Sequence, residues 1–205
     1  MKHASEIEKK QNAVYKGVYW FNEDHPNNPA FFAITKNAST SMRNTLRAKT
    51  VGEFFKEKEP SGRTNFTIIR NPIDRFVSGF LEVCALTMPK KFEISGKSMI
   101  KFIDDLKEHF FNIHILPQVH FVSNSDGELI DLDYWILFDN LEEEYYEMCE
   151  NISLPRTKLR KDRPTLDSKK DNVIKHMTPE IKDMVISVYK DDWELYNKLK
   201  NERSK

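Results

Sequence analysis

The sequence has 205 residues, of which 39% are hydrophobic and 31% are charged, which is the composition of a folded protein and excludes a largely disordered chain. Lys and Arg together number 32, as do Asp and Glu, so the net charge is zero and gives no bulk electrostatic basis for binding nucleic acid or a membrane surface. We expect a single domain over residues 1–205, with flexible ends at 1–12 and 201–205.

The polar N-terminal segment and the two cysteines bear on the cellular compartment. Met1 to Gln11 has no apolar core of signal-peptide length, and no later window has the apolar run needed for a membrane span. Cys84 and Cys149 each lie in an apolar helical pattern, which is typical of buried thiols rather than of a disulfide. Both observations favour a cytoplasmic protein.

The first half of the chain contains two transitions from a strand to a helix. Phe31 to Thr35 is a short apolar and β-branched run that predicts a strand, and Ser39 to Lys49 then predicts a helix. Phe66 to Ile69 predicts a second strand. The helix after it starts with Asn71 as its cap and a proline at the first helical position, and continues through Leu86.

The second half of the chain adds helices, strands and a polar loop. Apolar spacing predicts helices over 98–109, 141–152 and 178–199. Short apolar runs predict strands at 121–122 and 134–138, and the composition of 154–171 predicts a long loop. Alternating strands and helices predict an α/β fold with a mainly parallel central sheet, whose ligand site lies at the carboxyl ends of the strands.

The first polar motif follows the first predicted strand. It consists of Lys36, Asn37, Ala38, Ser39, Thr40 and Ser41. Backbone N–H groups at the start of a helix bind phosphate, hydroxyl groups add donors, and a lysine adds a mobile cation. The glycines and the final Gly-Lys-Ser/Thr of a Walker A loop are missing. The alternative is an ordinary helix cap beside a solvated lysine.

The second polar motif follows the second predicted strand. Arg70 leaves this strand, and Ser78 lies two helical turns later on nearly the same face of the helix. A guanidinium group and a hydroxyl group arranged in this way can hold one phosphate. The alternative is a capped helix in which Arg70 pairs with Asp74.

The two motifs resemble the two signatures with which sulfotransferases bind 3'-phosphoadenosine-5'-phosphosulfate (PAPS). Arg70 to Phe80 is similar to the Arg-Asp-Pro-aromatic-Glu-Arg-Leu-Val-Ser-Ala-Tyr pattern of carbohydrate O-sulfotransferases of the chondroitin, dermatan and HNK-1 type. His114 to Gln118 resembles the His-Trp-x-Pro-Gln segment of that family, and Tyr134 to Leu141 resembles its later strand and helix. The chain departs from the family at Asn37-Ala38, where many relatives carry glycine, and at Ile115, where the family has Trp.

The resemblance implies a fold, a donor and a set of donor-binding residues. The implied fold is a P-loop-like three-layer domain with helices flanking the sheet, and the implied donor is PAPS, which leaves as 3'-phosphoadenosine-5'-phosphate (PAP). Residues 36–41 would hold the 5'-phosphosulfate, and Arg70 and Ser78 the 3'-phosphate. The basic segment 158–163, with Arg163, would close over the 3'-phosphate or the adenine, although a solvated charge run explains it equally well.

The catalytic assignments include two candidates for the base. Lys36 is expected to stabilise the leaving oxygen, while an acceptor hydroxyl needs a base. The segment 37–69 contains no histidine, so we rank His114 first as the base and Glu53 second. No cluster with metal-ligand spacing is present in the sequence, and no metal is expected.

Three function classes therefore remain for the site. The first is a PAPS-dependent sulfotransferase that acts on a carbohydrate or a small-molecule hydroxyl. The second is a nucleotide-dependent phosphotransferase of P-loop-like fold, for which Asp139 after a strand would have to hold the metal. The third is a PAP-binding module without catalysis. The oligomeric state is left open.

Overall fold

A computed structural model gives the architecture of the chain. It describes residues 18–21, 29–47, 50–53, 62–87, 93–110, 112–124, 126–160 and 167–204, and for 18–21 and 50–53 it describes the backbone alone.

The centre of the molecule is a five-stranded sheet with the order β3-β1-β2-β4-β5. Its parallel strands are β2 (Ala30–Phe32), β4 (Asn65–Ile69) and β5 (Tyr134–Leu137). This parallel core confirms the predicted α/β fold. Two strands that the sequence did not predict, β1 (Val18–Phe21) and β3 (Thr50–Glu53), extend the sheet by antiparallel pairing.

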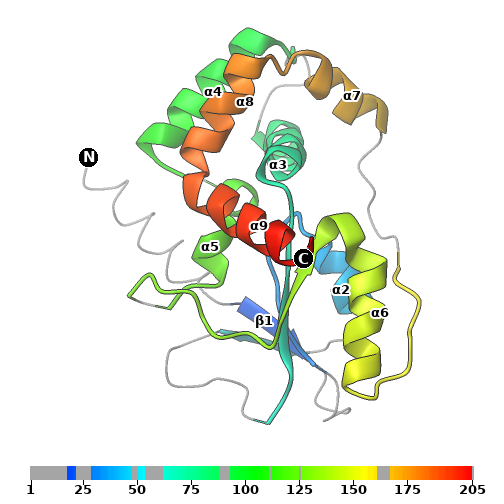
Figure 1. Cartoon of the computed structure of the whole chain (residues 1–205). Coiled ribbons are helices and arrows are strands. Elements are labelled where there is room, and N and C mark those ends of the chain that lie inside the picture. The colour runs from blue at the N-terminus through cyan, green and yellow to red at the C-terminus, as the bar shows by residue number, and fades with distance from the viewer. Residues whose placement is uncertain are drawn as a thin grey trace.

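Helices cover both faces of the sheet (Figure 1), and alternate side chains of the parallel strands pack against these helices. On one face, the rings of Phe31 and Phe66 stack with centroids 5.0 Å apart, and α2 (Ser39–Thr45) and α6 (Leu141–Asn151) cover them. On the other face, buried side chains including Phe32, Ile69 and Leu137 pack against α5 (Gln118–Phe121) and α9 (Lys190–Glu202). The result is three layers.

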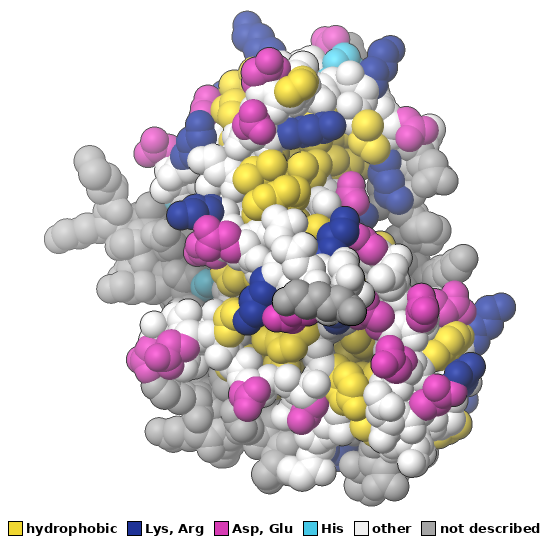
Figure 2. Space-filling model, in the orientation of Figure 1, with side chains coloured by type: hydrophobic (Ala, Val, Ile, Leu, Met, Phe, Trp, Pro, Cys, Tyr) yellow, Lys and Arg dark blue, Asp and Glu magenta, His cyan; other side chains and the backbone are white. Residues whose placement is uncertain are grey.

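A third apolar cluster joins the helices that lie beyond the sheet in Figure 1. These helices are α3 (Pro72–Thr87), α4 (Gly96–Glu108), α7 (Asp167–Lys175) and α8 (Pro179–Val188). The Phe80 and Phe102 rings meet edge to face at its centre, with centroids 4.9 Å apart. Figure 2 shows hydrophobic side chains gathered on the surface over α3, whereas Lys, Arg, Asp and Glu are interspersed over the rest of that face.

Two predicted elements are wrong: one predicted strand is the end of a helix, and one predicted helix is two helices. The segment 121–122 is not a strand, because Phe121 ends α5 and Val122 forms the turn after it; both side chains are buried, which made the pair look like a strand. The predicted helix over 178–199 is two helices, since the chain bends at Tyr189 (φ −109°, ψ 40°). The apolar stripe continues across the bend because both helices face the core.

Two predicted boundaries also move. The helix that follows β2 ends at Thr45 instead of Lys49, because Arg47 has a positive φ of 51° that an α-helix does not accept. The loop predicted over 154–171 is irregular at 154–160, but α7 begins at Asp167.

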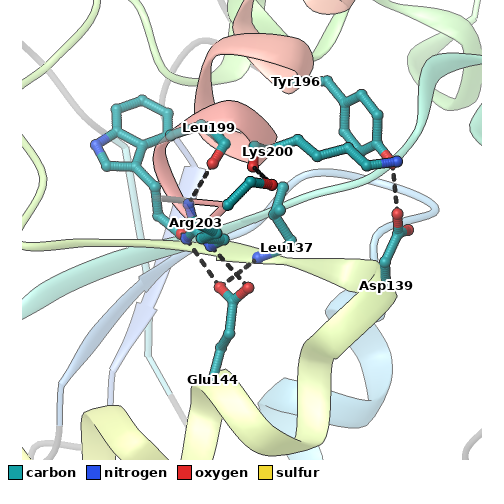
Figure 3. Close-up of polar contacts among 9 residues, drawn as sticks. Leu137, Asp139, Glu144, Tyr196, Leu199, Lys200 and Arg203 are labelled. Carbon is teal, nitrogen blue, oxygen red and sulfur yellow. Dashed lines mark hydrogen bonds and ion pairs between the residues drawn. The ribbon is translucent and has the colours of Figure 1, made fainter.

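The carboxyl end of β5 is tied to helices from both faces of the sheet, as Figure 3 shows. The Glu144 carboxylate of α6 accepts a hydrogen bond from the Leu137 backbone N–H (2.9 Å) and pairs with the Arg203 guanidinium group (2.7 Å). Arg203 also donates to the Trp135 carbonyl and, at 2.9 Å, to the Leu199 carbonyl. These contacts, which we call the β5 clasp, fix α6 and the end of α9 to one strand.

Candidate active site

The turn between β2 and α2 has an unusual backbone. Lys36 (φ 68°) and Ala38 (φ 58°) both adopt the left-handed conformation, which is uncommon for residues other than glycine. Ala38 caps α2 without a side-chain hydrogen bond, so no side chain satisfies the first N–H groups of this helix at its cap position. The left-handed Ala38 is one of the two residues at which the sequence departs from the glycine expected from the family resemblance.

Arg70 reaches from the end of β4 to this turn. Its Nη1 donates a hydrogen bond to the Lys36 carbonyl (3.0 Å), and its guanidinium group lies over the Phe138 ring, 4.5 Å from the centroid. Burial lowers the pKa of Arg70, while the charges of Asp74 and Asp139 oppose that effect. The guanidinium group therefore bonds to the turn after β2, whereas the alternative expectation was that it pairs with Asp74.

Gln118 is the residue that connects the two strand ends. Its side chain is fully buried at the start of α5. The Oε1 atom accepts hydrogen bonds from Asn37 Nδ2 (2.6 Å) and from the Arg70 backbone N–H (2.9 Å), while Nε2 donates to the Arg70 carbonyl (2.9 Å). Asn37 Nδ2 also donates to the Ile68 carbonyl (2.7 Å). One amide thus fixes the turn after β2 relative to the residue after β4.

A buried acid and a buried arginine bond to the backbone at the start of α5 and in the turn after β2. Asp192 of α9 is 1% exposed and accepts hydrogen bonds from the backbone N–H groups of Gln118 (2.7 Å) and Val119 (2.9 Å). Arg75 of α3 is 2% exposed, and its Nε donates to the Thr35 carbonyl (3.2 Å). Burial lowers the pKa of Arg75, and the charge of Asp192 raises it, so each charge compensates the other in the interior.

Lys36, Glu82 and His114 form the more open part of the site. The Lys36 ammonium group pairs with the Glu82 carboxylate of α3 at 3.2 Å. Burial and the charge of Lys36 lower the pKa of the half-buried His114, whereas the charge of Glu82 raises it. The imidazole is therefore neutral near pH 7, which is the form that accepts a proton.

His114 is placed by close backbone packing against α3. It lies in the short 3-10 helix η1 (Ile113–Ile115), whose start is capped by the Asn112 side chain. A Cβ atom added to Gly79 would lie only 2.5 Å from the His114 carbonyl oxygen, so only glycine permits this approach. The Thr35 hydroxyl donates to the Ile113 carbonyl (2.8 Å) and joins η1 to the turn after β2.

The remaining predicted residues lie in α3, α2 and β3, with one outside the described residues. Ser78 is buried in α3 (5% exposed), and Ser39, Thr40 and Ser41 form the half-buried first turn of α2. The backbone of Glu53 ends β3 opposite Val18, two strand positions from β2. Arg163 lies outside the described residues.

Unsatisfied buried polar atoms gather in this region. Of the five buried side-chain N and O atoms without a hydrogen-bond partner among the described residues, three are Asn37 Oδ1, Arg70 Nε and His114 Nδ1. Such atoms are rare in folded proteins and carry a cost of roughly 1–3 kcal/mol each. Asn37 Oδ1 is an acceptor and Arg70 Nε is a donor, so these atoms fit a site that both donates hydrogen bonds to a ligand and accepts them from it.

The site contains four residues to which sequence reasoning assigned no role. They are Arg75, Glu82, Gln118 and Asp192. A local signal existed for Glu82, because it lies four residues after Ser78 and so on the same face of α3. Asp192 gave no such signal, since its partners lie 73 and 74 positions away along the chain.

The described ranges contain neither a metal-binding cluster nor a membrane-spanning helix. No group of three or more His, Cys, Asp and Glu side chains there is arranged to hold a metal ion. Of the helices in the same ranges, none is both long enough and apolar enough to cross a membrane. Asp139, the metal ligand that a phosphotransferase would need, instead accepts a hydrogen bond from the Tyr196 hydroxyl (Figure 3).

Comparison with known proteins gives one match. Residues 18–198 match the family model described as "Sulfotransferase family". The matched range includes the turn after β2, the start of α3 and η1. No curated protein and no solved structure matches the chain.

Proposed function

Because this chain belongs to the sulfotransferase family, we propose that it transfers a sulfuryl group from PAPS to a hydroxyl group of a carbohydrate and releases PAP. The observation that carries this proposal is the hydrogen bond from Arg70 Nη1 to the Lys36 carbonyl (3.0 Å). It brings the basic residues of both predicted anion-binding motifs together at the carboxyl ends of two parallel strands, where α/β proteins bind their ligands.

The donor would be held by the two strand ends. The turn and first helical residues 36–41 would bind the 5'-phosphosulfate, while Arg70, Ser78 and Arg163 would bind the 3'-phosphate. The buried Arg70 Nε atom, which has no partner among the described residues, is a donor suited to a phosphate oxygen. The similarity of Arg70 to Phe80 to carbohydrate O-sulfotransferases supports a carbohydrate acceptor over other hydroxyl compounds.

The transfer needs a cation and a base. The acceptor oxygen forms a bond to sulfur while the bond from sulfur to the 5'-phosphate oxygen breaks, and the electron pair of that bond remains on PAP. Lys36 would stabilise this leaving oxygen, and His114 would take the hydroxyl proton. Glu53 is the second choice for the base, since its backbone lies two strands from β2.

The donor site is tested first by calorimetric titration with PAP, with ATP as the competing ligand. We expect micromolar PAP affinity, about −8 kcal/mol, that falls at least tenfold in both Arg70→Ala and Ser78→Ala. Lys101→Ala, which removes an exposed ion pair on α4, is the control and should bind normally. Tighter, magnesium-dependent binding of ATP would contradict the proposal and favour the phosphotransferase.

The base is tested by the pH dependence of transfer. Because burial and Lys36 lower the pKa of His114 below its usual 6.5, the rate should rise with pH through a value below 6.5 and then level off. His114→Ala should abolish most activity. Activity that stays within a few-fold of the parent would remove His114 from this role, and PAP binding without any transfer would identify a binding module.

A further inference from the structure

Glu82 lies inside the candidate site and has no role in the function proposed so far. It projects from α3 one helical turn beyond Ser78, and its carboxylate is 3.2 Å from the Lys36 ammonium group. The Lys36 side chain is 18% exposed and that of Glu82 is 40% exposed, so the pair borders solvent. A ligand can therefore reach both charges without unfolding of the surrounding structure.

The same carboxylate acts on His114. Gly79, three residues before Glu82 on α3, packs against the His114 backbone, and three charged groups act on this imidazole: Lys36 from the turn after β2, and Arg75 and Glu82 from α3. The two cations and burial disfavour the charged imidazolium form, and Glu82 is the one influence of the four that favours it. Glu82 is thus coupled both to the cation and to the base of the proposed reaction.

We propose that Glu82 is a positioning residue for sulfuryl transfer. It holds Lys36 beside His114 before the donor binds, and it stabilises the imidazolium that forms when His114 takes the proton of the acceptor. This inference rests on the proposed function, because it assigns work to Glu82 only if a proton moves to His114.

The proposed roles of Lys36, Glu82 and His114 can be followed through one turnover. When the donor binds, the Lys36 ammonium group exchanges the Glu82 carboxylate for the bridging oxygen of the donor. As the acceptor oxygen binds sulfur and the phosphate oxygen leaves with its electron pair, the hydroxyl proton moves to His114. The positive imidazolium then lies near a carboxylate that Lys36 no longer neutralises, and proton loss to solvent restores the starting state.

The decisive experiment is the titration of His114 by nuclear magnetic resonance in the parent protein, Glu82→Gln and Glu82→Asp. Loss of the carboxylate should lower the pKa of His114, and Glu82→Asp should restore most of the parent value. The expected sign follows from the attraction between the carboxylate and the imidazolium. Glu143→Gln, which removes an exposed acid from α6, is the control and should leave the titration unchanged.

Activity provides a second readout, with chemically desulfated chondroitin as the probe acceptor. Glu82→Gln should lower kcat about tenfold or more and change the KM for the acceptor by less than about threefold. PAP affinity should not fall, because Glu82→Gln releases Lys36 for the ligand. A purely structural role would instead lower PAP affinity and the urea midpoint together.

The outcomes separate this inference from the proposed function. If the pKa of His114 is the same in Glu82→Gln as in the parent, the role of Glu82 is wrong, whatever the protein binds. If the pKa falls but the parent protein does not bind PAP, the coupling is real and the proposed function is wrong, so the assignment to sulfuryl transfer fails with it.

Discussion

The two strand ends that form the candidate site are built in different ways. After β4, Asn71 accepts a hydrogen bond from the Ile73 backbone N–H (2.9 Å), and Pro72 begins α3, so neighbouring residues define the start of the helix, while Gln118 holds the Arg70 backbone from 48 positions away. After β2, the turn has a left-handed alanine and no side-chain cap, and its Asn37 is held by partners 31 and 81 positions away. The start of α3 is therefore readable from the sequence, while the turn after β2 depends on distant parts of the fold.

The largest loss of stability should come from substitution of the buried Asp192. Asp192→Ala removes the acceptor for two backbone N–H groups and leaves Arg75 buried without its compensating charge. We expect the free energy of unfolding to fall by about 3–5 kcal/mol. Urea denaturation followed by circular dichroism measures this change.

The neighbouring Asp191 provides a matched control for this substitution. It lies in the same first turn of α9 but is exposed. Asp191→Ala should cost less than about 1 kcal/mol, because only a favourable charge near the start of a helix is lost. Equal losses in the two variants would show that the turn does not depend on the buried acid.

Removal of the connecting amide should have the next largest effect. Gln118→Ala leaves the Arg70 backbone groups without their side-chain partner and frees Asn37 on one side. We expect a loss of about 2–3 kcal/mol in unfolding free energy and a fall in PAP affinity larger than the change in Asn140→Ala. Asn140 is an exposed amide that makes no capping hydrogen bond, so it should be silent in both assays.

The locally defined strand end should respond more weakly. Asn71→Ala removes one cap from a long helix that the apolar cluster also holds. A loss of about 1 kcal/mol in unfolding free energy is expected, again by urea denaturation. A loss of stability larger than that of Gln118→Ala would show that the local cap matters more than the distant contacts of the turn after β2.

The smallest effect should be a gain at the strained turn. Ala38→Gly relieves the left-handed backbone, in part offset by the greater freedom of glycine in the unfolded chain, so we expect stabilisation of about 0.5 kcal/mol. Ala38→Val, a β-branched residue at the same positive φ, should instead be destabilising. Calorimetric melting of both variants gives the order, and a Val variant more stable than the Gly variant would contradict the observed backbone.

The sequence predicted those parts of the fold whose signals are local. Strands β4 and β5 are mostly apolar, aromatic or β-branched and pack against helices on both faces, and the start of α3 carries its own cap. Strand β3 (Thr50–Glu53) has one large apolar residue, Val51, and is identified only by its pairing with β1. The bend at Tyr189 was missed because both helices that it joins keep one apolar stripe.

The site, like the fold, was predicted where the signal is local and missed where residues meet only through packing. Lys36, Arg70 and His114 were singled out from motifs, and the structure places Arg70 against the Lys36 backbone and His114 under the influence of the Lys36 charge. The acid beside them was not singled out. Its spacing from Ser78 places Glu82 on the same face of α3, but the contact of that face with Lys36 results from the packing of α3 against η1 and the turn after β2.

The β5 clasp has a consequence for how copies of the molecule can associate. β5 is the last strand in the sheet order, and an outermost strand with unpaired N–H and C=O groups is a template on which another chain can aggregate. Here the Leu137 N–H is already bonded to Glu144, and the Trp135 carbonyl is bonded to Arg203. A second chain would have to displace both side chains before its own backbone could add to the sheet at β5.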